Sequence, residues 1–401
     1  MPTKAFRTPA KLIAVLTLSL ALGSCGGTSP VICNTAPGSS GGTCTCGSGT
    51  AACPVSPGPE FLYATNLRGQ ILAFSIDRNG GALTMIGSVP GPVLSLGITT
   101  VSNQFLYASD TDNAQLDGFS INQTTGALTA LAGSPFSTGT LSVPGALASP
   151  PADLASSPGS SLLYAADAGV IDAFTISAAG KPTALSGPPY VAESGFSIVV
   201  DPSGRFLYAS DDDPPGGIFA FTTGSTGALT AVPDSPFTIP GQTVVDSLPV
   251  GIVDTGAYVY SALSLANQIA GFSIANGTGA LTSVPGSTFS AGPAPTKLVV
   301  AGNFLYVVNS SNGGILSDGS ISGYSIDSAT GVLTPLSGSP FAIAAISLAT
   351  DSFGEYLYVA GLTGIQGFSI DSTSGALTPL SGSPFPASGP ILLTIVQIPP
   401  P

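Results

Sequence analysis

The sequence predicts an all-β protein built around a single seven-bladed β-propeller, and two observations carry this prediction. One phrase occurs twice, because residues 325–341 read SIDSATGVLTPLSGSPF and residues 369–385 read SIDSTSGALTPLSGSPF. The composition, with 52 Gly, 36 Pro and only 7% charged residues, suits short strands joined by tight turns. Since 43% of the residues are hydrophobic, the chain can still build a core.

The repeated phrase belongs to a unit that occurs seven times. Each unit contains a triplet that ends in Tyr, and successive triplets are 44 to 57 residues apart. Repeats of about this length with four short strands each are typical of propeller blades. The triplets are FLY 61–63, FLY 105–107, LLY 162–164, FLY 206–208, YVY 258–260, FLY 304–306 and YLY 356–358.

Three further strands are expected around each triplet. An alternating segment such as GFSI 118–121 follows it, and a short segment such as GALT 126–129 comes next. Pro in the following GSPF 338–341 fits an outer edge, because Pro has no N–H to offer another strand. Apolar runs that precede five of the triplets predict inner strands buried on both faces, at 95–101, 196–201, 248–253, 296–301 and 345–350.

The C-terminus is expected to close the ring. The first triplet, at 61–63, has no inner strand before it, whereas ILLTIV 391–396 looks like the inner strands of the other blades. We therefore expect this C-terminal strand to pair with N-terminal blade 1. The propeller would then occupy residues 59–401 as one domain.

Residues 1–24 are predicted to be a lipoprotein signal peptide. Three basic residues precede the apolar segment 12–23, which is too short to span a bilayer. The LGSC sequence that follows is similar to a bacterial lipobox, and this implies lipidation of Cys25; an ordinary secretory signal with a chance Cys is the alternative. We expect an exported bacterial lipoprotein of the cell envelope, on the outer membrane or a periplasm-facing membrane surface, attached to the membrane through its lipid alone.

Residues 25–58 are predicted to form a tether rich in Gly, Ser and Thr. It contains Cys33, Cys44, Cys46 and Cys53, an even set that indicates two disulfides in an exported protein. A bond between the two closest cysteines would be strained, which leaves 33–44 with 46–53, or 33–46 with 44–53. A zinc site is the rival, and the lack of His disfavours it.

The charge balance excludes some partners. Cleavage of the signal peptide removes Lys4, Arg7 and Lys11 and takes the formal net charge from −13 to −16. Such an acidic protein is not expected to bind nucleic acid or anionic lipid surfaces. We expect a monomer whose partner is an envelope glycan, a peptide or a protein.

Segments DPSGRFLYAS 201–210 and GYSIDSATGVLTPL 323–336 resemble repeats of the seven-bladed β-propeller lactonase family. That group includes 6-phosphogluconolactonase-like proteins and the YVTN-repeat surface proteins. The resemblance covers about residues 58–401 and implies the propeller fold. The better-understood enzymes of this kind use His, Arg and Glu in a central cleft. No such role can be carried over, because this chain has no His. A phosphosugar substrate would require a basic cluster, and Arg68 is the only Arg expected on the likely binding side.

Two acidic loops are the candidate metal site. The loops that follow two of the triplets contain SDTDNAQLD 109–117 and SDDDPPGG 210–217. Carboxylates are the ligands that Ca²⁺ prefers, although Asp is also a common turn former that keeps a surface solvated. The candidate ligands are Asp110, Asp112, Asp117, Asp211, Asp212 and Asp213. No other cofactor is indicated.

Two functions of different classes follow. The first is an envelope-anchored binding module without catalysis, which the missing catalytic side chains favour. The alternative is a lactonase-type hydrolase of a sugar lactone, with Ca²⁺ at the acidic loops, which the resemblance favours. The sequence leans toward the first and identifies no catalytic residue. Without His, only a Lys could activate a Ser, and Lys297, on an expected inner strand, could face the central channel; an ordinary strand residue with its ammonium group at the rim is the favoured interpretation.

Overall fold

The computed structural model describes residues 32–33, 43–46, 49–52, 58–138, 152–167, 169–185, 190–191, 195–211, 216–241, 248–310, 319–361 and 363–400. The chain divides into two compact units. One unit is Met1–Gly58 with Pro399–Pro401, and the other is Pro59–Ile398. The described residues form strands and turns and no helix, so none of them forms an element with the length and hydropathy of a membrane-crossing helix.

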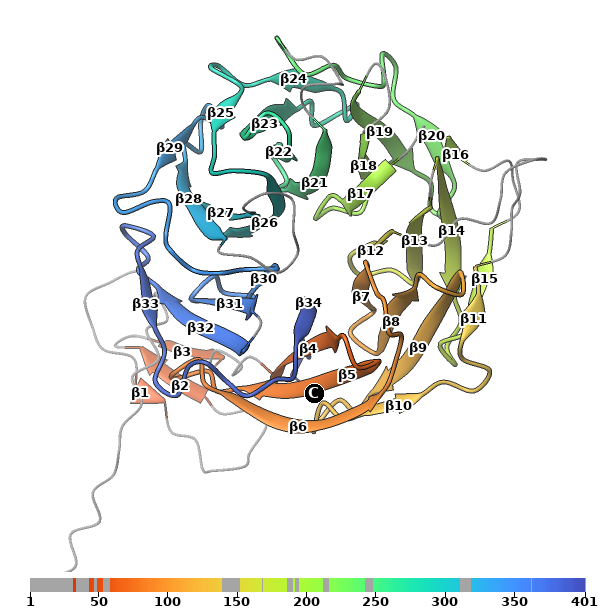
Figure 1. Cartoon of the computed structure of the whole chain (residues 1–401). Helices are drawn as coiled ribbons and strands as arrows, with labels where there is room; N and C mark the ends of the chain where they lie inside the picture. Colours follow the sequence, from red (N-terminus) through yellow and green to blue (C-terminus); the bar gives the residue numbers. More distant parts are fainter. Residues whose placement is uncertain are drawn as a thin grey trace, which may run out of the picture. The chain divides into compact units, whose positions relative to one another are not determined.

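Seven antiparallel sheets make up the larger unit, and each is one blade of the predicted propeller, with four strands in order from the axis outward (Figure 1). From the axis outward, blade 1 contains β34 (Pro390–Gln397), β4 (Glu60–Asn66), β5 (Gln70–Ile76) and β6 (Leu83–Pro90); blade 2 contains β7 (Ile98–Val101), β8 (Phe105–Asp110), β9 (Gln115–Ile121) and β10 (Leu128–Ala130); blade 3 contains β12 (Asp153–Ser156), β13 (Leu162–Asp167), β14 (Val170–Ile176) and β15 (Pro182–Ala184). Blade 4 contains β17 (Gly195–Val200), β18 (Phe206–Asp211), β19 (Gly217–Thr223) and β20 (Leu229–Ala231); blade 5 contains β21 (Pro249–Asp254), β22 (Tyr258–Leu263), β23 (Gln268–Ile274) and β24 (Leu281–Ser283). Blade 6 contains β26 (Pro295–Ala301), β27 (Phe304–Asn309), β28 (Ser320–Ile326) and β29 (Leu333–Pro335); blade 7 contains β30 (Ser347–Thr350), β31 (Tyr356–Gly361), β32 (Gly364–Ile370) and β33 (Leu377–Pro379).

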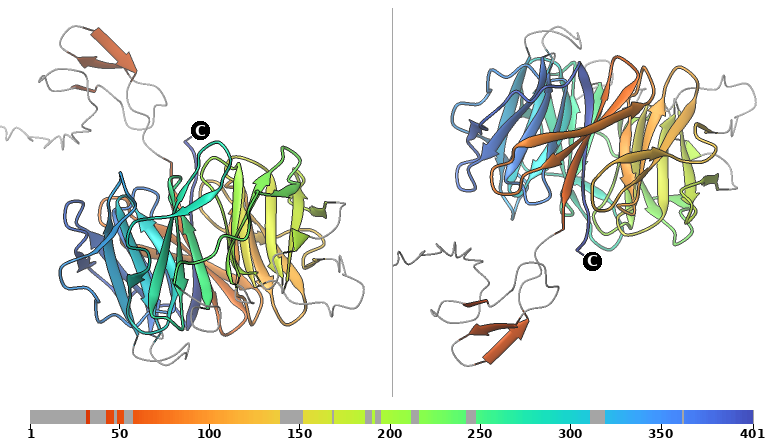
Figure 2. Two further views of the ribbon diagram at one scale, coloured as in Figure 1. Left: turned by 90° about the horizontal axis from the view of Figure 1, so that it is seen from above. Right: turned by 90° about the horizontal axis from the view of Figure 1, so that it is seen from below.

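The inner strands form a closed circle around the axis. In order they are β34, β7, β12, β17, β21, β26 and β30, and each contacts the next, with β30 returning to β34. The edge-on views of Figure 2 show these strands running from one face of the ring to the other. All five inner strands expected from the sequence are confirmed, and the structure adds β12 of blade 3.

The C-terminal strand closes the ring as predicted. Strand β34 pairs antiparallel with β4, so that Leu393 lies opposite Ala64 and Ile395 opposite Leu62. Blade 1 is therefore built from one C-terminal and three N-terminal strands.

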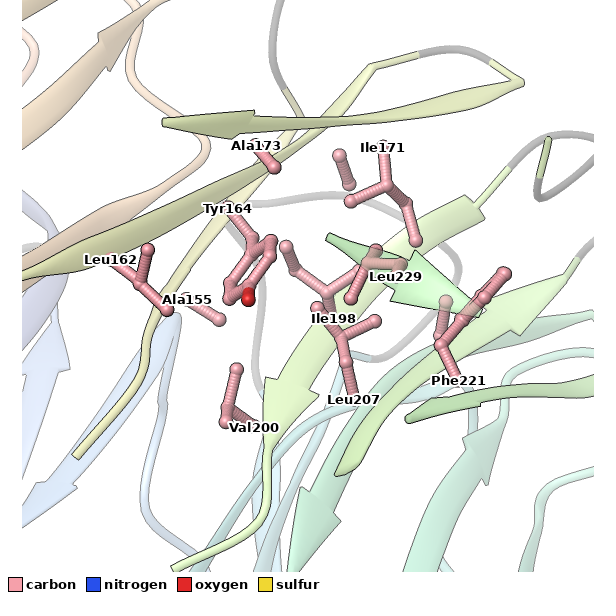
Figure 3. Close-up of a cluster of buried hydrophobic side chains, with 12 residues drawn as sticks. Ala155, Leu162, Tyr164, Ile171, Ala173, Ile198, Val200, Leu207, Phe221 and Leu229 are labelled. Atoms are coloured by element: carbon pink, nitrogen blue, oxygen red, sulfur yellow. The ribbon is translucent and has the colours of Figure 1, made fainter. Parts of the chain in front are cut away.

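The hydrophobic core is divided among the blade interfaces. Seven clusters of buried side chains lie one at each junction between neighbouring blades. At the junction of blades 3 and 4, Tyr164 and Ile171 of one blade pack against Ile198 and Leu207 of the other (Figure 3). Because each sheet presents one apolar face to each neighbour, the ring is stabilised only when it is complete.

The Tyr of each triplet joins its blade to the next. Its side chain is fully buried, and its hydroxyl donates a hydrogen bond to the carbonyl of a Gly in the following blade. The first residue of the triplet packs against the same Gly, where a Cβ would overlap it. The pairs are Tyr63–Gly126, Tyr107–Gly180, Tyr164–Gly227, Tyr208–Gly279, Tyr260–Gly331, Tyr306–Gly375 and Tyr358–Gly81, with O···O distances of 2.5–3.2 Å.

Replacing one of these tyrosines tests the hydrogen bond alone. In Tyr260→Phe the ring stays buried, but the carbonyl of Gly331 loses its partner at 2.7 Å. We expect the free energy of unfolding to fall by about 1–2 kcal/mol, measured by urea denaturation. Tyr190→Phe, a partly exposed tyrosine outside the triplets, is the control. Equal losses in both variants would contradict the role given to the triplet.

The repeated phrase builds the outer half of a blade. In blade 6, Asp327 accepts hydrogen bonds from the backbone of the turn that follows it. After the LT strand, the Ser339 hydroxyl accepts one from the N–H of Gly323 at 2.9 Å, and Phe341 then pairs with Ile321. The GSPF sequence therefore covers the remaining length of the third strand, as the expected outer edge. In three blades this pairing appears as the short strands β11 (Phe136–Ser137), β16 (Tyr190–Val191) and β25 (Phe289–Ser290).

The smaller unit contains one three-stranded sheet. Its strands are β1 (Ile32–Cys33), β2 (Thr43–Cys46) and β3 (Gly49–Ala52). The antiparallel register sets Cys33 opposite Cys44. The two disulfide pairings stay predictions; the signal peptide, Cys25 and Cys53 lie outside the described residues.

Candidate functional site

The antiparallel strand order gives the propeller two faces. The loop face carries the loops between the second and third strands and the links that lead into the next inner strand. The turn face carries the turns between inner and second strands and the hairpins before the outer strands. Long, variable connections are the usual place for binding residues, so the loop face is the first candidate.

Carboxylates on the turn face hold the chain in its turns. Asp201 accepts hydrogen bonds from the backbone N–H groups of Arg205 at 2.6 Å and Phe206 at 2.7 Å. Asp351 does the same in blade 7 for the N–H groups of Glu355 at 2.8 Å and Tyr356 at 2.6 Å. Both side chains are buried and bonded to the backbone of their own turns, so we infer that their role is structural.

The arginines lie where the sequence places them. On the turn face, Arg205 donates to the backbone carbonyl and side-chain oxygen of Asn276 at 3.0 and 2.7 Å, which ties blade 4 to blade 5. Arg78 lies over the ring of Phe353, 5.1 Å from its centroid, at the junction of blades 1 and 7. Arg68 is exposed in the β4–β5 loop of the loop face.

The predicted acidic residues are distributed over two blades. Asp110 and Asp211 are the last residues of the second strands of blades 2 and 4, and both are buried, at 8% and 0% exposure. Asp112 is exposed in the loop that follows Asp110. Asp212 and Asp213 lie outside the described residues.

Asp110 and Asp117 lie on the same face of blade 2. Asp117 is opposite Ala108, which is two residues before Asp110 on β8, so the side chains of all three point the same way. Both oxygens of Asp110 accept hydrogen bonds from Asn113, at 3.3 Å from its backbone N and 2.8 Å from its Nδ2. Burial, and then repulsion from Asp110, raise the pKa of Asp117 to about 6.

A calcium site is not assembled by the described part of these loops. Among the described residues, no three side chains of His, Cys, Asp or Glu come together as a group that could hold a metal ion. Asp110 and Asp117 lie near each other, but Asp112 does not join them as a third metal ligand. With residues 212–215 undescribed, Ca²⁺ binding at the second loop stays a prediction.

Asp117→Asn should change the pH dependence of stability. Because the pKa of Asp117 is raised from 3.8 to about 6, the folded protein favours the protonated carboxyl. This contribution to stability is complete below about pH 4 and is lost as the pH rises through about 6. At pH 7 the variant, which cannot ionise, should be more stable than the parent by about 1 kcal/mol, after allowance for solvent screening. Urea denaturation at pH 4 and pH 7 measures this difference.

Asp112→Asn is the matched control for that experiment, because Asp112 is an exposed carboxylate in the loop that leads into β9. If Asp117→Asn gains no stability over the parent between pH 4 and pH 7, the burial argument for Asp117 is wrong.

The inner strands contain only three charged residues among those the structure describes. Asp153 begins β12 and Lys297 lies in the first half of β26, so both are at the loop-face end. Asp254 ends β21 and is at the turn face, where burial raises its pKa to about 6. Because inner strands surround the axis, Asp153 and Lys297 are the charged groups on the strands nearest to it at the loop face.

The carboxylate of Asp153 is held in place by the next blade. Its Oδ2 accepts hydrogen bonds from the Ser197 hydroxyl at 2.6 Å and from the Ile198 N–H at 3.2 Å, while Oδ1 accepts one from the Leu154 N–H at 2.9 Å. The side chain of Asp153 is half-buried. A fixed carboxylate that keeps some exposure can accept a proton from a bound water.

Lys297 lies in a β-bulge of blade 6. The register shifts between Pro295 and Leu298, and the two bulged residues include Lys297. Its side chain is half-buried, and it has no hydrogen bond or ion pair with any other described residue. An ammonium group in such a position is suited to stabilise negative charge that develops on a carbonyl oxygen.

The sequence pointed to Lys297 and missed Asp153. The segment DLAS 153–156 is too short and too polar to be recognised as an inner strand. The signal that could have found it is the turn SPGS 157–160, which precedes LLY 162–164 as DPSG 201–204 precedes FLY 206–208.

Comparison with known families matches part of the propeller. The family model described as "Lactonase, 7-bladed beta-propeller" matches residues 256–391. These residues run from the turn before the second strand of blade 5 to the start of β34. Among curated protein sequences, none matches this chain.

Solved structures share the fold over most of the chain. A putative 6-phosphogluconolactonase from Bacteroides fragilis is 18% identical, covers 84% of this chain and 98% of its own, and has a TM-score of 0.67. A second, from Bacteroides uniformis, gives 18% identity, 85% and 100% coverage and a TM-score of 0.67. The periplasmic gluconolactonase of Pseudomonas aeruginosa is 18% identical, covers 85% of this chain and 99% of its own, and has a TM-score of 0.66. At this level of identity, the comparisons show the fold.

Proposed function

Because this chain carries a seven-bladed β-propeller of the lactonase type, we propose that it hydrolyses the ring ester of an uncharged lactone at its loop face. The observation that carries the proposal is a carboxylate and an ammonium group, Asp153 and Lys297, on inner strands at that end of the axis. Fold resemblance alone would not assign a reaction.

The two groups suit the chemistry of lactone hydrolysis. Asp153 takes a proton from a water molecule, and the water oxygen attacks the lactone carbonyl carbon. Lys297 stabilises the negative charge on the carbonyl oxygen in the tetrahedral intermediate. When this intermediate collapses, the bond from the carbonyl carbon to the ring oxygen breaks, and Asp153 gives the proton that it took from water to the ring oxygen. The product is the open hydroxy acid.

Ser197 serves as a positioning residue in this scheme. Its hydroxyl donates to Oδ2 of Asp153 at 2.6 Å from the neighbouring inner strand, and it is itself 4% exposed. A buried donor on a rigid strand fixes the carboxylate without exchanging with solvent.

The charges favour an uncharged substrate. Arg68 and Lys297 are the basic residues described on the loop face, whereas phosphate recognition in proteins relies on clusters of Arg and Lys. Two of the structural neighbours are described as putative 6-phosphogluconolactonases and one as a gluconolactonase. Of these substrates, the lactone without a phosphate fits this loop face better.

The binding-module function favoured by the sequence is the second candidate. The complete lack of His supports it, because the chain lacks a residue type that the better-understood enzymes of the resembling family use. The match to the lactonase model favours hydrolysis instead. In the second candidate a glycan, peptide or protein would occupy the same loop face without being converted.

Substitution of the two charged groups tests the assignment. We expect Asp153→Asn to lower kcat for glucono-δ-lactone at least about 100-fold, and Lys297→Met by a similar factor. Asp254→Asn is the matched control, because it removes an inner-strand carboxylate from the turn face and should leave the rate within about twofold. A wild-type rate in Asp153→Asn, with the fold intact by circular dichroism, would refute its role as the base.

The lipid anchor at Cys25 and the envelope location are also proposals, supported by the LGSC sequence after an apolar segment. Labelled palmitate should enter the parent protein in a bacterial host and fail to enter Cys25→Ser. Equal labelling of both would refute the anchor.

A further inference from the structure

Three exposed apolar side chains lie on the loop face, in two neighbouring segments that connect strands of blades 1 and 2. Leu67 is in the β4–β5 loop, and Val93 and Leu94 are in the link from β6 to β7. Their exposed fractions are 53%, 59% and 37%. We refer to these three residues as the apolar patch. Single exposed apolar residues are ordinary, but three of them on two segments that contact each other beside a candidate site indicate a binding surface.

The two segments that carry the apolar patch are locked together. The N–H of Gly91 donates to the carbonyl of Gly69 at 3.0 Å, and a Cβ at Gly69 would lie 3.1 Å from Cγ2 of Val93. The side-chain oxygen of Asn66 accepts from the N–H groups of Arg68 and Gln70, each at 3.0 Å. The patch is therefore presented on a fixed backbone.

The same link leads from the apolar patch to Asp153. The hydroxyl of Ser109 accepts hydrogen bonds from the N–H groups of Leu96 and Gly97 at 3.1 and 2.9 Å. Gly97 lies against the inner strand of blade 3, where a Cβ would be 2.9 Å from the carbonyl carbon of Asp153. Gly97 is three positions after Leu94, a span of at most about 11 Å. The patch thus begins within reach of a substituent on a ring bound at Asp153.

We propose that the lactone taken by this site carries an uncharged alkyl or acyl chain, with its ring at Asp153 and its chain on the apolar patch. This inference rests on the proposed hydrolysis and specifies its substrate class. The patch contains no carboxylate, and its neighbour Arg68 is the one charged side chain of the β4–β5 loop. Exposed apolar side chains can contact a flexible apolar chain, whereas a polyhydroxylated substituent would lose hydration there.

The expected effect follows from apolar burial. Complete burial of one methylene group changes a binding constant about fourfold, and a surface that covers one side of the chain should give about twofold per methylene. The ratio kcat/KM should rise by this factor for each methylene that reaches the patch.

The experiment compares δ-valerolactone, δ-nonalactone and δ-undecalactone, which share one ring and carry no chain, a butyl chain and a hexyl chain. With the full-length protein we expect kcat/KM to rise along the series. The triple variant Leu67→Ser, Val93→Ser, Leu94→Ser should lose that dependence on chain length. Leu265→Ser is the control, since Leu265 is 59% exposed in the loop of blade 5 and lies outside the patch.

The outcomes separate this inference from the proposed function. Equal kcat/KM for the three lactones overturns the chain-binding inference and leaves lactone hydrolysis standing. If no lactone is hydrolysed, calorimetry with the matching alkyl δ-lactams decides. Affinity that rises with chain length in the parent and not in the triple variant supports the apolar patch as a chain site. If the affinity of the parent protein does not rise with chain length, the chain-binding inference is overturned.

Discussion

Deletion of Pro390–Pro401 is expected to unfold the propeller. The deleted segment supplies the inner strand of blade 1, which pairs with β4 and contacts the inner strands of blades 2 and 7. Five of its apolar side chains are buried, namely Ile391, Leu392, Leu393, Val396 and Ile398, with exposures of 2–8%. Each contributes about 1.5–3 kcal/mol, so their combined loss is comparable to the whole stability of a typical protein.

The measurement is thermal unfolding followed by circular dichroism, with deletion of residues 399–401 alone as the control. The control keeps β34 and should melt like the parent. If the long deletion does not express, full-length Leu393→Asp tests the same strand by placing a charge in the junction of blades 7 and 1. A long deletion or a Leu393→Asp variant that melts like the parent would contradict closure by β34.

Gly331→Ala is expected to lower the free energy of unfolding by about 2–5 kcal/mol. Gly331 has a φ of +74°, and a Cβ there would lie 2.4 Å from Cδ1 of Tyr258 in blade 5. The backbone strain of a side chain in this region contributes about 1–2 kcal/mol, and the overlap with a packed ring contributes about 1–3 kcal/mol. The same change would also displace the carbonyl that accepts the hydroxyl of Tyr260.

Gly277→Ala is the matched control for this substitution. Gly277 lies in the corresponding hairpin of blade 5, and a Cβ there would meet nothing within 4 Å. Urea denaturation should show little change for Gly277→Ala and a much earlier midpoint for Gly331→Ala. Similar midpoints for the two variants would refute the proposed contact between triplet and Gly.

The blade count and the strand order could be predicted because each blade solves the same local problem. A Tyr such as Tyr260 needs a buried acceptor, and a Gly such as Gly331 can provide it while leaving room for the first residue of the triplet. Every repeat therefore contains both the Tyr of the triplet and a Gly, and the seven repeats can be recognised in the sequence. The vacant place in blade 1 could likewise be matched to the apolar C-terminal strand.

The inner strand of blade 3 could not be predicted from its composition. Its buried positions are Leu154 and Ala155, and its two end residues, Asp153 and Ser156, are polar. Asp153 is tolerated in this inner strand because Ser197 and Ile198 of the neighbouring blade donate hydrogen bonds to it. Contacts with another blade leave no pattern in the local sequence.

The acidic candidates were chosen by clustering in sequence, and the fold separates them. Asp110 and Asp211 occupy the same position in blades 2 and 4, with blade 3 between them. Asp117 lies on the third strand and meets Asp110 only through cross-strand register. The two residues that we propose for hydrolysis, Asp153 and Lys297, come from blades 3 and 6 and are far apart in the sequence.

The most direct test of the proposed function is the rate of ring opening of uncharged lactones by the full-length protein. A pH-stat would follow glucono-δ-lactone and δ-nonalactone beside 6-phosphogluconolactone, in Ca²⁺ and in EDTA, each against its spontaneous rate. We predict turnover of an uncharged lactone well above the spontaneous rate, with a kcat/KM at least about tenfold higher than for the phosphorylated one. Spontaneous rates for all three lactones in both conditions would contradict hydrolysis and leave the loop face as a binding surface.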